Sequence, residues 1–230
     1  MPKDPKLKER LETVQASIDR ALNESMRGRG GLTMVAVSKR QPLSVVHQGY
    51  ELGLRHFGEN QIQEGIPKLK ASPEDITWHL IGHLQKNKVR KAVTHFPYIH
   101  SIDSLSLLQR VDRIAAEERV CPKIFLQVNY ALDADKHGLH PEAVRPVLEA
   151  ALSLKHLNCI GLMAIPPVGA EGDKLSAYFE GMVKMRDELK AALPDWEGKL
   201  SLGMSGDFEE AVRAGSHFVR IGSALFGARQ

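Results

Sequence analysis

Short strand-like runs alternate with helical stretches along almost the whole chain, and this alternation limits the folds that the sequence can adopt. The runs are rich in β-branched and aromatic residues, and apolar residues recur at helical spacing between them. Eight strands are predicted, at residues 33–38, 54–58, 77–82, 98–103, 123–129, 157–164, 200–205 and 217–222. Helices are predicted at residues 6–26, 42–52, 60–70, 84–94, 104–119, 141–154, 174–192 and 207–214.

The alternation predicts parallel strand pairing, with helices covering the sheet. Eight parallel strands suit a closed (β/α)₈ TIM barrel better than an open doubly wound sheet, which is usually smaller. Residues 1–230 are therefore expected to form one α/β domain, in which residues 1–28 hold an extra helix. Because few residues follow the eighth strand, we expect this helix to pack on the barrel where a final helix would lie. The segment "RGRGG" (27–31) precedes a strand, so it is interpreted as a helix stop and turn.

Composition excludes several classes of function. The chain is 43% hydrophobic and 26% charged, and its net charge of +3 is too small to predict a nucleic-acid partner. No apolar run approaches the length of a membrane span, and the first residues lack the apolar core of a signal peptide. Cys121 and Cys159 fit no metal or redox spacing. We expect a cytoplasmic protein with reduced thiols, no metal site and no membrane partner.

In a barrel of this kind the active site lies at the carboxyl ends of the strands. Polar or potential pocket residues occur there after several strands: Lys39 after strand one, Asn60 after strand two, His83 after strand three and Met163 at the end of strand six. Small residues follow the last two strands, in "GMSGD" and "RIGS". The sequence therefore predicts a pocket at this end of the barrel.

The small residues after strands seven and eight predict a phosphate site. Ser205 and Gly206 follow strand seven, and Gly222 and Ser223 follow strand eight. Glycine lets backbone N–H groups approach a ligand closely, and serine hydroxyls add donors. Each pair alone would suit an ordinary turn, but two pairs on neighbouring strands favour phosphate.

Arg220 and Lys39 would flank this site. Arg220 lies two residues before Gly222, so both point to the same side of the strand, and a salt bridge to Glu59 or Asp207 is the alternative to a ligand contact. Lys39 is either a solvated charge at a strand end or an amine nucleophile. Since strands one and eight are neighbours in a closed barrel, a phosphorylated aldehyde could reach Lys39. Pyridoxal 5′-phosphate (PLP) combines both groups.

Several motifs resemble those of the pyridoxal phosphate homeostasis protein family. They are "AVSK", "FGEN", "WHLIGHLQKNK", "GLM" followed by "PP", "LSLGMSGD" and "VRIGSALFGAR", and their order matches from residue 32 to residue 229. This family is similar to the barrel domains of alanine racemase and eukaryotic-type ornithine decarboxylase.

The resemblance implies a role for each matched residue. Lys39 would hold PLP as a Schiff base, and Arg220 would face the pyridine nitrogen. Asn60 and Met163 would line the ring, and the phosphate would be held by Ser205, Gly206, Gly222 and Ser223. The family implies PLP storage and delivery inside the cell without established catalytic activity, with apo-enzymes that use PLP as recipients.

Two other functions stay open at this stage. An arginine opposite the ring nitrogen makes the ring a weaker electron sink, which reduces the range of reactions that PLP could support here. A minimal PLP-dependent racemase or lyase stays compatible with the sequence. Racemases of this type take a second acid/base from an added β-domain, and we expect no such domain after Gln230. A monomer is therefore expected. An aldolase-like barrel that uses Lys39 on a sugar phosphate is the other alternative.

The other histidines and the remaining basic residues are interpreted as structural or solvent-exposed, or as part of the pocket rim. His79 and His83 straddle a strand end, so structural or pocket-rim roles are expected. No carboxylate lies at useful spacing from the remaining histidines considered, which are His95, His100, His137 and His140. The basic run "QKNKVRK" (85–91) is interpreted as a solvated helix face.

Overall fold

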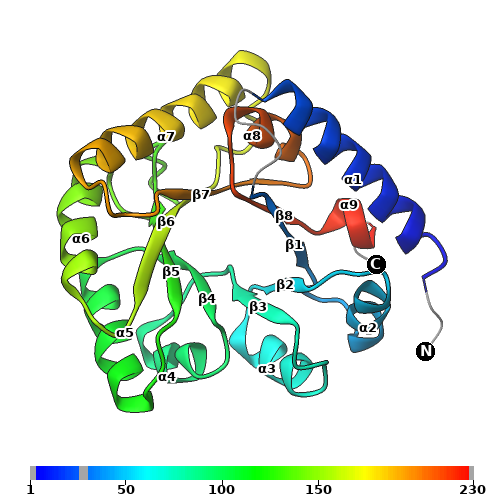
Figure 1. Cartoon of the computed structure of the whole chain (residues 1–230), viewed down its shortest axis with the longest axis horizontal. Coiled ribbons are helices and arrows are strands. Elements are labelled where there is room, and N and C mark those ends of the chain that lie inside the picture. The colour runs from blue at the N-terminus through cyan, green and yellow to red at the C-terminus, as the bar shows by residue number, and fades with distance from the viewer. Residues whose placement is uncertain (1–3, 26–30, 228–230) are drawn as a thin grey trace.

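The computed structural model describes residues 4–25 and 31–227, and it shows a closed barrel of eight parallel strands (Figure 1). The strands follow one another around the barrel in chain order, and the last pairs with the first. They are β1 (Thr33–Val37), β2 (His56–Glu59), β3 (Thr77–Leu80), β4 (Tyr98–Ile102), β5 (Lys123–Val128), β6 (Asn158–Ala164), β7 (Lys199–Met204) and β8 (Phe218–Ile221). The predicted fold class and the predicted strands are confirmed.

Helices surround the barrel, as the alternation predicts. They are α1 (Leu7–Glu24), α2 (Leu43–Glu51), α3 (Ile62–Lys70), α4 (Val89–Val93), α5 (Leu105–Glu118), α6 (Pro141–Ser153), α7 (Gly172–Ala192), α8 (Phe208–Ala214) and α9 (Ser223–Phe226). The predicted helix at 84–94 is shorter than expected, because a 3₁₀ turn, η1 (Lys86–Lys88), replaces its beginning. The predicted stop and turn in "RGRGG" falls mainly on residues 27–30, which lie outside the described residues.

The amino-terminal helix α1 lies on the outside of the barrel beside α8 and α9, as Figure 1 shows. Its apolar stripe is buried, with Leu7, Val14 and Ile18 each at most 4% exposed. A stripe that recurs every three or four residues must pack against another surface to leave water. The expectation that this helix fills the place of a final barrel helix is confirmed.

The barrel wall separates two sets of side chains because successive residues of a strand point to opposite faces. On β8, Val219 and Ile221 point outward into the main core under the helices, whereas Phe218 and Arg220 point inward. Inside the barrel the buried apolar residues form a small cluster of Val35, Phe125, Ile160, Met163 and Phe218. The interior also contains buried polar side chains, which are His79, His100, Ser201 and Arg220.

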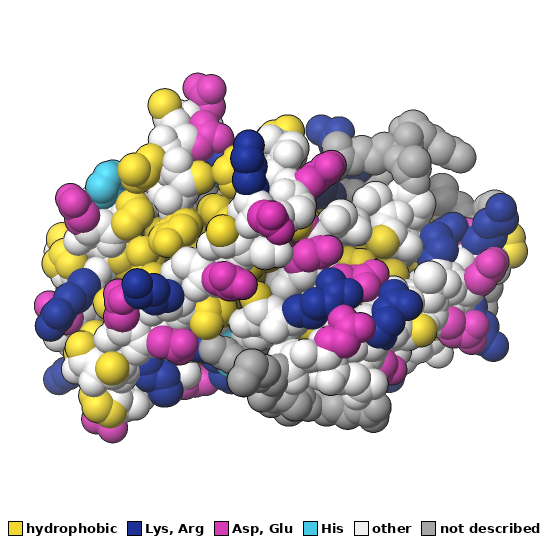
Figure 2. Space-filling model, turned by 90° about the horizontal axis from the view of Figure 1, so that it is seen from above, with side chains coloured by type: hydrophobic (Ala, Val, Ile, Leu, Met, Phe, Trp, Pro, Cys, Tyr) yellow, Lys and Arg dark blue, Asp and Glu magenta, His cyan; other side chains and the backbone are white. Residues whose placement is uncertain are grey.

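The described surface carries charges of both signs. Figure 2 shows Lys and Arg interspersed with Asp and Glu on one face of the molecule. Both cysteines are free, with Cys121 exposed and Cys159 buried. Among the described residues, no helix combines the length and the apolar character that a membrane span needs.

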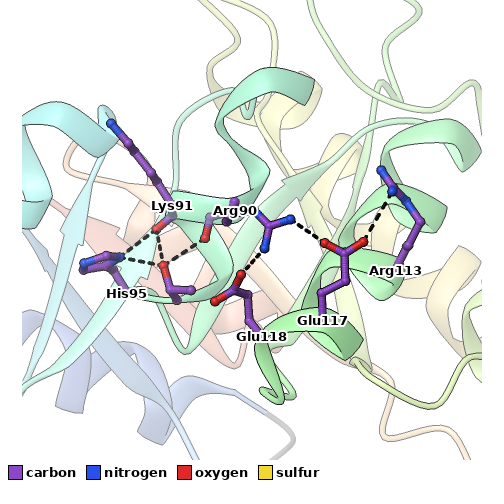
Figure 3. Close-up of polar contacts among 7 residues, drawn as sticks. Arg90, Lys91, His95, Arg113, Glu117 and Glu118 are labelled. Carbon is purple, nitrogen blue, oxygen red and sulfur yellow. Dashed lines mark hydrogen bonds and ion pairs between the residues drawn. The ribbon is translucent and has the colours of Figure 1, made fainter.

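The basic run at 85–91 lies on the surface, as expected, and it takes part in ion pairs with the next helix. Arg90 of α4 contacts Glu117 and Glu118 of α5, and Arg113 also contacts Glu117 (Figure 3). Arg90 is 54% exposed, so these pairs add little to stability. They connect two neighbouring helices and carry no sign of a ligand site.

Candidate functional site

A cavity of about 330 Å³ opens at the carboxyl ends of the strands. Seven of the nine predicted site residues line it: Lys39, Asn60, Ser205, Gly206, Arg220, Gly222 and Ser223. Val37, Gln41, Ile81, Ile165, Met204 and Gly227 complete the lining. The volume lies within the range that small-molecule sites usually have, about 300–1,000 Å³.

Lys39 reaches the cavity because the chain turns sharply after β1. Arg40 has φ +59°, in the left-handed region that a residue with a Cβ rarely adopts. The turn is held on both sides: Ser38 N donates to Gly58 O at 3.0 Å, and Lys68 Nζ donates to Ser38 O at 2.7 Å. Lys39 is half-buried and lines the cavity, so it is not simply a solvated strand end.

Behind this turn, between the barrel wall and α3, lies a charge cluster of Ser38, Glu59, Glu64 and Lys68. Glu59 Oε1 accepts hydrogen bonds from Ser38 Oγ and from Lys68 Nζ, both at 2.7 Å. Lys68 Nζ also contacts Glu64 Oε1 at 2.8 Å. Burial raises the pKa of the Glu59 carboxyl, while Lys68 and Ser38 act in the opposite direction. The partner of Glu59 is therefore Lys68, and the alternative pairing with Arg220 does not occur.

The loops after β7 and β8 meet through Ser205. Its Oγ accepts hydrogen bonds from Gly222 N at 3.0 Å and from Ala224 N at 3.3 Å. A Cβ built on Gly206 would meet no atom within 4 Å, so the fold leaves open space beside this backbone. Converging N–H groups, hydroxyls and free space suit the oxygen atoms of an anion such as phosphate.

Arg220 lies at the bottom of the cavity and is 4% exposed. Its Nη1 donates to Ser201 O at 2.6 Å and to Ser201 Oγ at 2.7 Å, and its Nη2 donates to Ala164 O at 3.1 Å. Burial lowers the pKa of the guanidinium to about 10, against the opposing influence of Asp207 and Tyr178. No ion pair of Arg220 occurs within residues 4–25 and 31–227, so the predicted alternative with Asp207 is also wrong.

Asn60 is placed by an unusually close backbone contact. A Cβ on Gly82 would lie 2.2 Å from Asn60 O, so only glycine permits the loops after β2 and β3 to approach this closely. Gly82 O in turn accepts a hydrogen bond from Ser101 Oγ at 2.7 Å. The loop contact holds Asn60 between the main cavity and a neighbouring cavity of about 280 Å³.

Two predicted site residues lie elsewhere. Met163 is 1% exposed and packs in the apolar cluster inside the barrel, where it does not line the cavity. Ile165, two residues later and on the same side of the chain, reaches the cavity instead. The sequence shows that Met163 and Ile165 point to the same side of the chain, but it does not show how far β6 extends toward the cavity. Met204, at the end of β7, was missed for the same reason.

His83 lines the neighbouring cavity, together with His137. We call His83, Asp103 and His137 the rim cluster. Asp103 Oδ2 lies 3.2 Å from His83 Nδ1 and 3.9 Å from His137 Nδ1, and the two imidazole rings are stacked with centroids 3.8 Å apart. The expectation that His137 has no carboxylate neighbour is therefore wrong. Three separate loops bring these residues together, which residue spacing does not reveal.

Comparison with known proteins identifies the family of this chain. Residues 20–230 match the family described as alanine racemase, N-terminal domain. A pyridoxal phosphate homeostasis protein of Aquifex aeolicus (strain VF5) is 35% identical over 227 residues, which cover 96% of this chain and 98% of that relative.

Solved structures extend the comparison to the whole barrel. PipY of Synechococcus elongatus is 39% identical; its structure without PLP gives a TM-score of 0.87 and its structure with PLP bound gives 0.85. Both cover 96% of this chain and 100% of PipY. An alanine racemase of Clostridium difficile 630, at 15% identity and a TM-score of 0.75, covers 96% of this chain and 60% of its own length, which shows a shared barrel fold.

Proposed function

Since this chain belongs to the pyridoxal phosphate homeostasis protein family, we propose that it binds PLP through a Schiff base on Lys39 and acts as a PLP carrier. One observation carries the proposal: an amine and a phosphate-type site line the same cavity from adjacent strands. Lys39 follows β1 and Gly222 follows β8, and these strands pair in register from Thr33 with Phe218 to Ala36 with Ile221. The PLP-bound structure of PipY supports the choice of ligand.

The residues around the cavity fit the functional groups of PLP. Gly206, Gly222 and Ser223 would bind the phosphate together with Ser205, whose hydroxyl already accepts two backbone N–H groups. Arg220 would donate to the ring nitrogen, because its three hydrogen bonds to Ser201 and Ala164 leave two of the five guanidinium N–H groups. Asn60 would lie beside the ring. Bound PLP supplies an aldehyde that captures amines.

Covalent capture requires the neutral amine of Lys39. The Lys39 amine would condense with the aldehyde that bound PLP supplies, and the aldehyde oxygen would leave as water. This bond is reversible, so exchange with another amine would release PLP to an enzyme that lacks it. The sharp turn at Arg40 holds Lys39 at the cavity while the phosphate site fixes the other end of the ligand.

The groups around the cavity favour a carrier over a racemase or lyase. Among the described lining residues, the titratable side chains are Lys39 and Arg220. Arg220 is a poor proton donor to the ring because a guanidinium seldom gives up its proton. Tyr178 donates its hydroxyl to Ile165 O at 3.0 Å, and burial raises the pKa of this phenol. The described lining of the main cavity therefore offers no second base for racemisation.

Borohydride trapping tests the covalent step. Purified protein is mixed with PLP, reduced with borohydride, digested and mapped by mass spectrometry; we expect the pyridoxyl group on Lys39. The visible absorption band of the adduct should disappear in Lys39→Ala and persist in Lys91→Ala, a matched change at an exposed lysine of α4. A label on another lysine, or an unchanged band in Lys39→Ala, would contradict the proposal.

A second measurement separates carrier from enzyme. The PLP-loaded protein is incubated with single amino acids in D₂O, and exchange of the α-proton is followed by NMR. We expect no sustained exchange beyond that caused by free PLP. Turnover that depends on Lys39 would favour the racemase or lyase alternative, and a Lys39 adduct with a sugar phosphate but none with PLP would favour the aldolase alternative.

A further inference from the structure

Three histidines on successive strands form a hydrogen-bonded series across the interior of the barrel. His56 Nδ1 of β2 lies 3.0 Å from His79 Nε2 of β3, and His79 Nδ1 lies 2.9 Å from His100 Nε2 of β4. His100 Nδ1 then lies 2.9 Å from Ser201 Oγ of β7, the atom to which Arg220 donates. We call His56, His79, His100 and Ser201 the histidine column.

The column is enclosed and its rings are held in place. His79, His100 and Ser201 have no exposed surface, whereas His56, at the far end from the cavity, is half-buried. Tyr98 stacks on His79 and Phe125 stacks on His100, each with ring centroids 4.4 Å apart. Packed rings on these faces prevent the imidazoles from turning over without opening the barrel interior.

Burial favours the neutral form of His79 and of His100, which limits how each can bond. Burial lowers the pKa of His79 and of His100 well below the usual value, and the positive charge of Arg220 acts on His100 in the same direction. A neutral imidazole has one N–H donor and one acceptor nitrogen. His79 and His100 must therefore each donate from one ring nitrogen and accept at the other.

Arg220 sets the direction of the whole series, because a guanidinium can only donate. Ser201 Oγ accepts from Arg220 Nη1, so the hydroxyl hydrogen is available for His100 Nδ1. His100 then carries its hydrogen on Nε2 and donates to His79 Nδ1, and His79 donates from Nε2 to His56 Nδ1. The opposite direction would leave the Ser201 hydrogen without an acceptor among the hydrogen bonds of the described residues.

We propose that the histidine column is a positioning relay, in which His100 fixes the Ser201 hydroxyl as the acceptor that holds Arg220 against the cofactor ring. This inference rests on the proposed function, because it assigns the ring nitrogen of PLP as the group that Arg220 contacts. His100 acts on the ligand only through Ser201 and Arg220. It is a positioning residue, and its effect reaches one atom of the ligand.

The tautomers of the column can be measured without any ligand. Long-range ¹H–¹⁵N NMR spectra of the ligand-free protein, assigned by single histidine substitutions, report which ring nitrogen carries hydrogen. We expect His56, His79 and His100 as neutral Nε2–H tautomers near pH 7.5. An Nδ1–H tautomer or a doubly protonated ring at His79 or His100 would overturn the relay, whether or not the protein binds PLP.

Binding of a ring-modified ligand tests the positioning role. His100→Phe keeps an aromatic ring against Phe125 but removes the acceptor, and we expect PLP to bind about 3- to 10-fold more weakly. With 1-deazapyridoxal 5′-phosphate, which lacks the ring nitrogen, His100→Phe and the unmodified protein should bind equally. His100→Asn should recover the affinity for PLP, because an asparagine oxygen can stand near the place of Nδ1.

The outcomes separate this relay from mere packing. Equal losses of PLP and of the deaza analogue in His100→Phe would show a structural role and overturn the proposal, as would failure of His100→Asn to differ from His100→Phe. If His100→Phe does not fold, Ser201→Ala carries the same comparison of ligands. Failure of the unmodified protein to bind either ligand would instead contradict the proposed function and leave the tautomer measurement as it stands.

Discussion

The charge cluster and the histidine column both bury polar side chains, but they satisfy them in opposite ways. Between β2 and α3, a lysine from the helix reaches the Glu59 carboxylate, so both charges are kept. Inside the barrel, the described residues place no carboxylate within bonding distance of His79 or His100; burial lowers the pKa of both imidazoles, and they share hydrogens along a series. The presence or absence of an oppositely charged partner, more than burial itself, therefore decides whether a buried side chain is charged.

The two regions also serve different parts of the candidate site. The charge cluster holds the turn that presents Lys39, through the bond from Lys68 Nζ to Ser38 O. The column holds Arg220, through Ser201. The covalent end and the ring end of the proposed ligand site are therefore supported by separate networks, which can be broken one at a time.

The largest expected effect follows from removing one partner of the charge cluster. Lys68→Met leaves Glu59 buried without its counter-charge, and we expect the free energy of unfolding to fall by about 3–5 kcal/mol. Urea unfolding followed by circular dichroism measures it. Lys70→Met, at an exposed position of the same helix, should change stability by no more than about 0.5 kcal/mol. A loss below about 1 kcal/mol in Lys68→Met would mean that Glu59 is already protonated in the folded protein.

The pH dependence of stability should differ in sign between the two regions. Burial lowers the pKa of His79 and His100 in the folded protein, whereas the unfolded chain takes up these protons near pH 6.5. Their contribution to stability is therefore lost as the pH falls below that value, by up to about 1.4 kcal/mol per pH unit for each fully buried histidine. Glu59 has a raised pKa, so it takes up its proton earlier when folded, and its contribution favours folding as the pH falls.

Urea unfolding at several pH values between 7 and 5 measures how the histidine contribution to stability depends on pH. The slope of stability against pH should be shallower in His100→Phe than in the unmodified protein, by up to about 1.4 kcal/mol per pH unit. His47→Phe, at an exposed histidine, serves as the control and should leave the slope unchanged. Equal slopes for His100→Phe and the unmodified protein would show that folded His100 takes up its proton over the same pH range as in the unfolded chain, which contradicts the lowered pKa.

The smallest expected effect is weak metal binding at the rim cluster. The histidines of this cluster are accessible to solvent, whereas His79 and His100 of the column are enclosed. His83, Asp103 and His137 hold their potential ligand atoms within 4.8 Å of one another, and His137 is 61% exposed. The planes of the His83 and His137 rings are nearly parallel, at 12° to each other. We expect weak Zn²⁺ binding by calorimetry that is lost in His137→Ala and kept in His100→Phe. Binding that is unchanged in His137→Ala would place the metal elsewhere.

The same contrast shows what residue patterns can reveal about histidines. His79 and His83 are four residues apart, yet one lies inside β3 and the other on the rim. A signal for the column was present: "LRHF", "TWHL" and "YIHS" each place a histidine at the third position of a strand-like run. Equivalent positions on neighbouring strands face the same side of a sheet. The rim cluster left no such signal, because its members lie in loops of unequal length.

Residue patterns were enough to predict the closed barrel, the position of Lys39 at a strand end and the small residues that follow β7 and β8, because strand and helix periodicities and glycine-serine turns are local properties of the chain. Three features emerge from the folded barrel alone: Glu59 pairs with Lys68, Met163 lies below the cavity while Ile165 lines it, and three histidines connect through Ser201 to Arg220. Those contacts depend on the stagger of the strands and on the direction in which each side chain enters the interior. Both are set by the tilt and shear of the strands in the closed barrel, which no local pattern specifies.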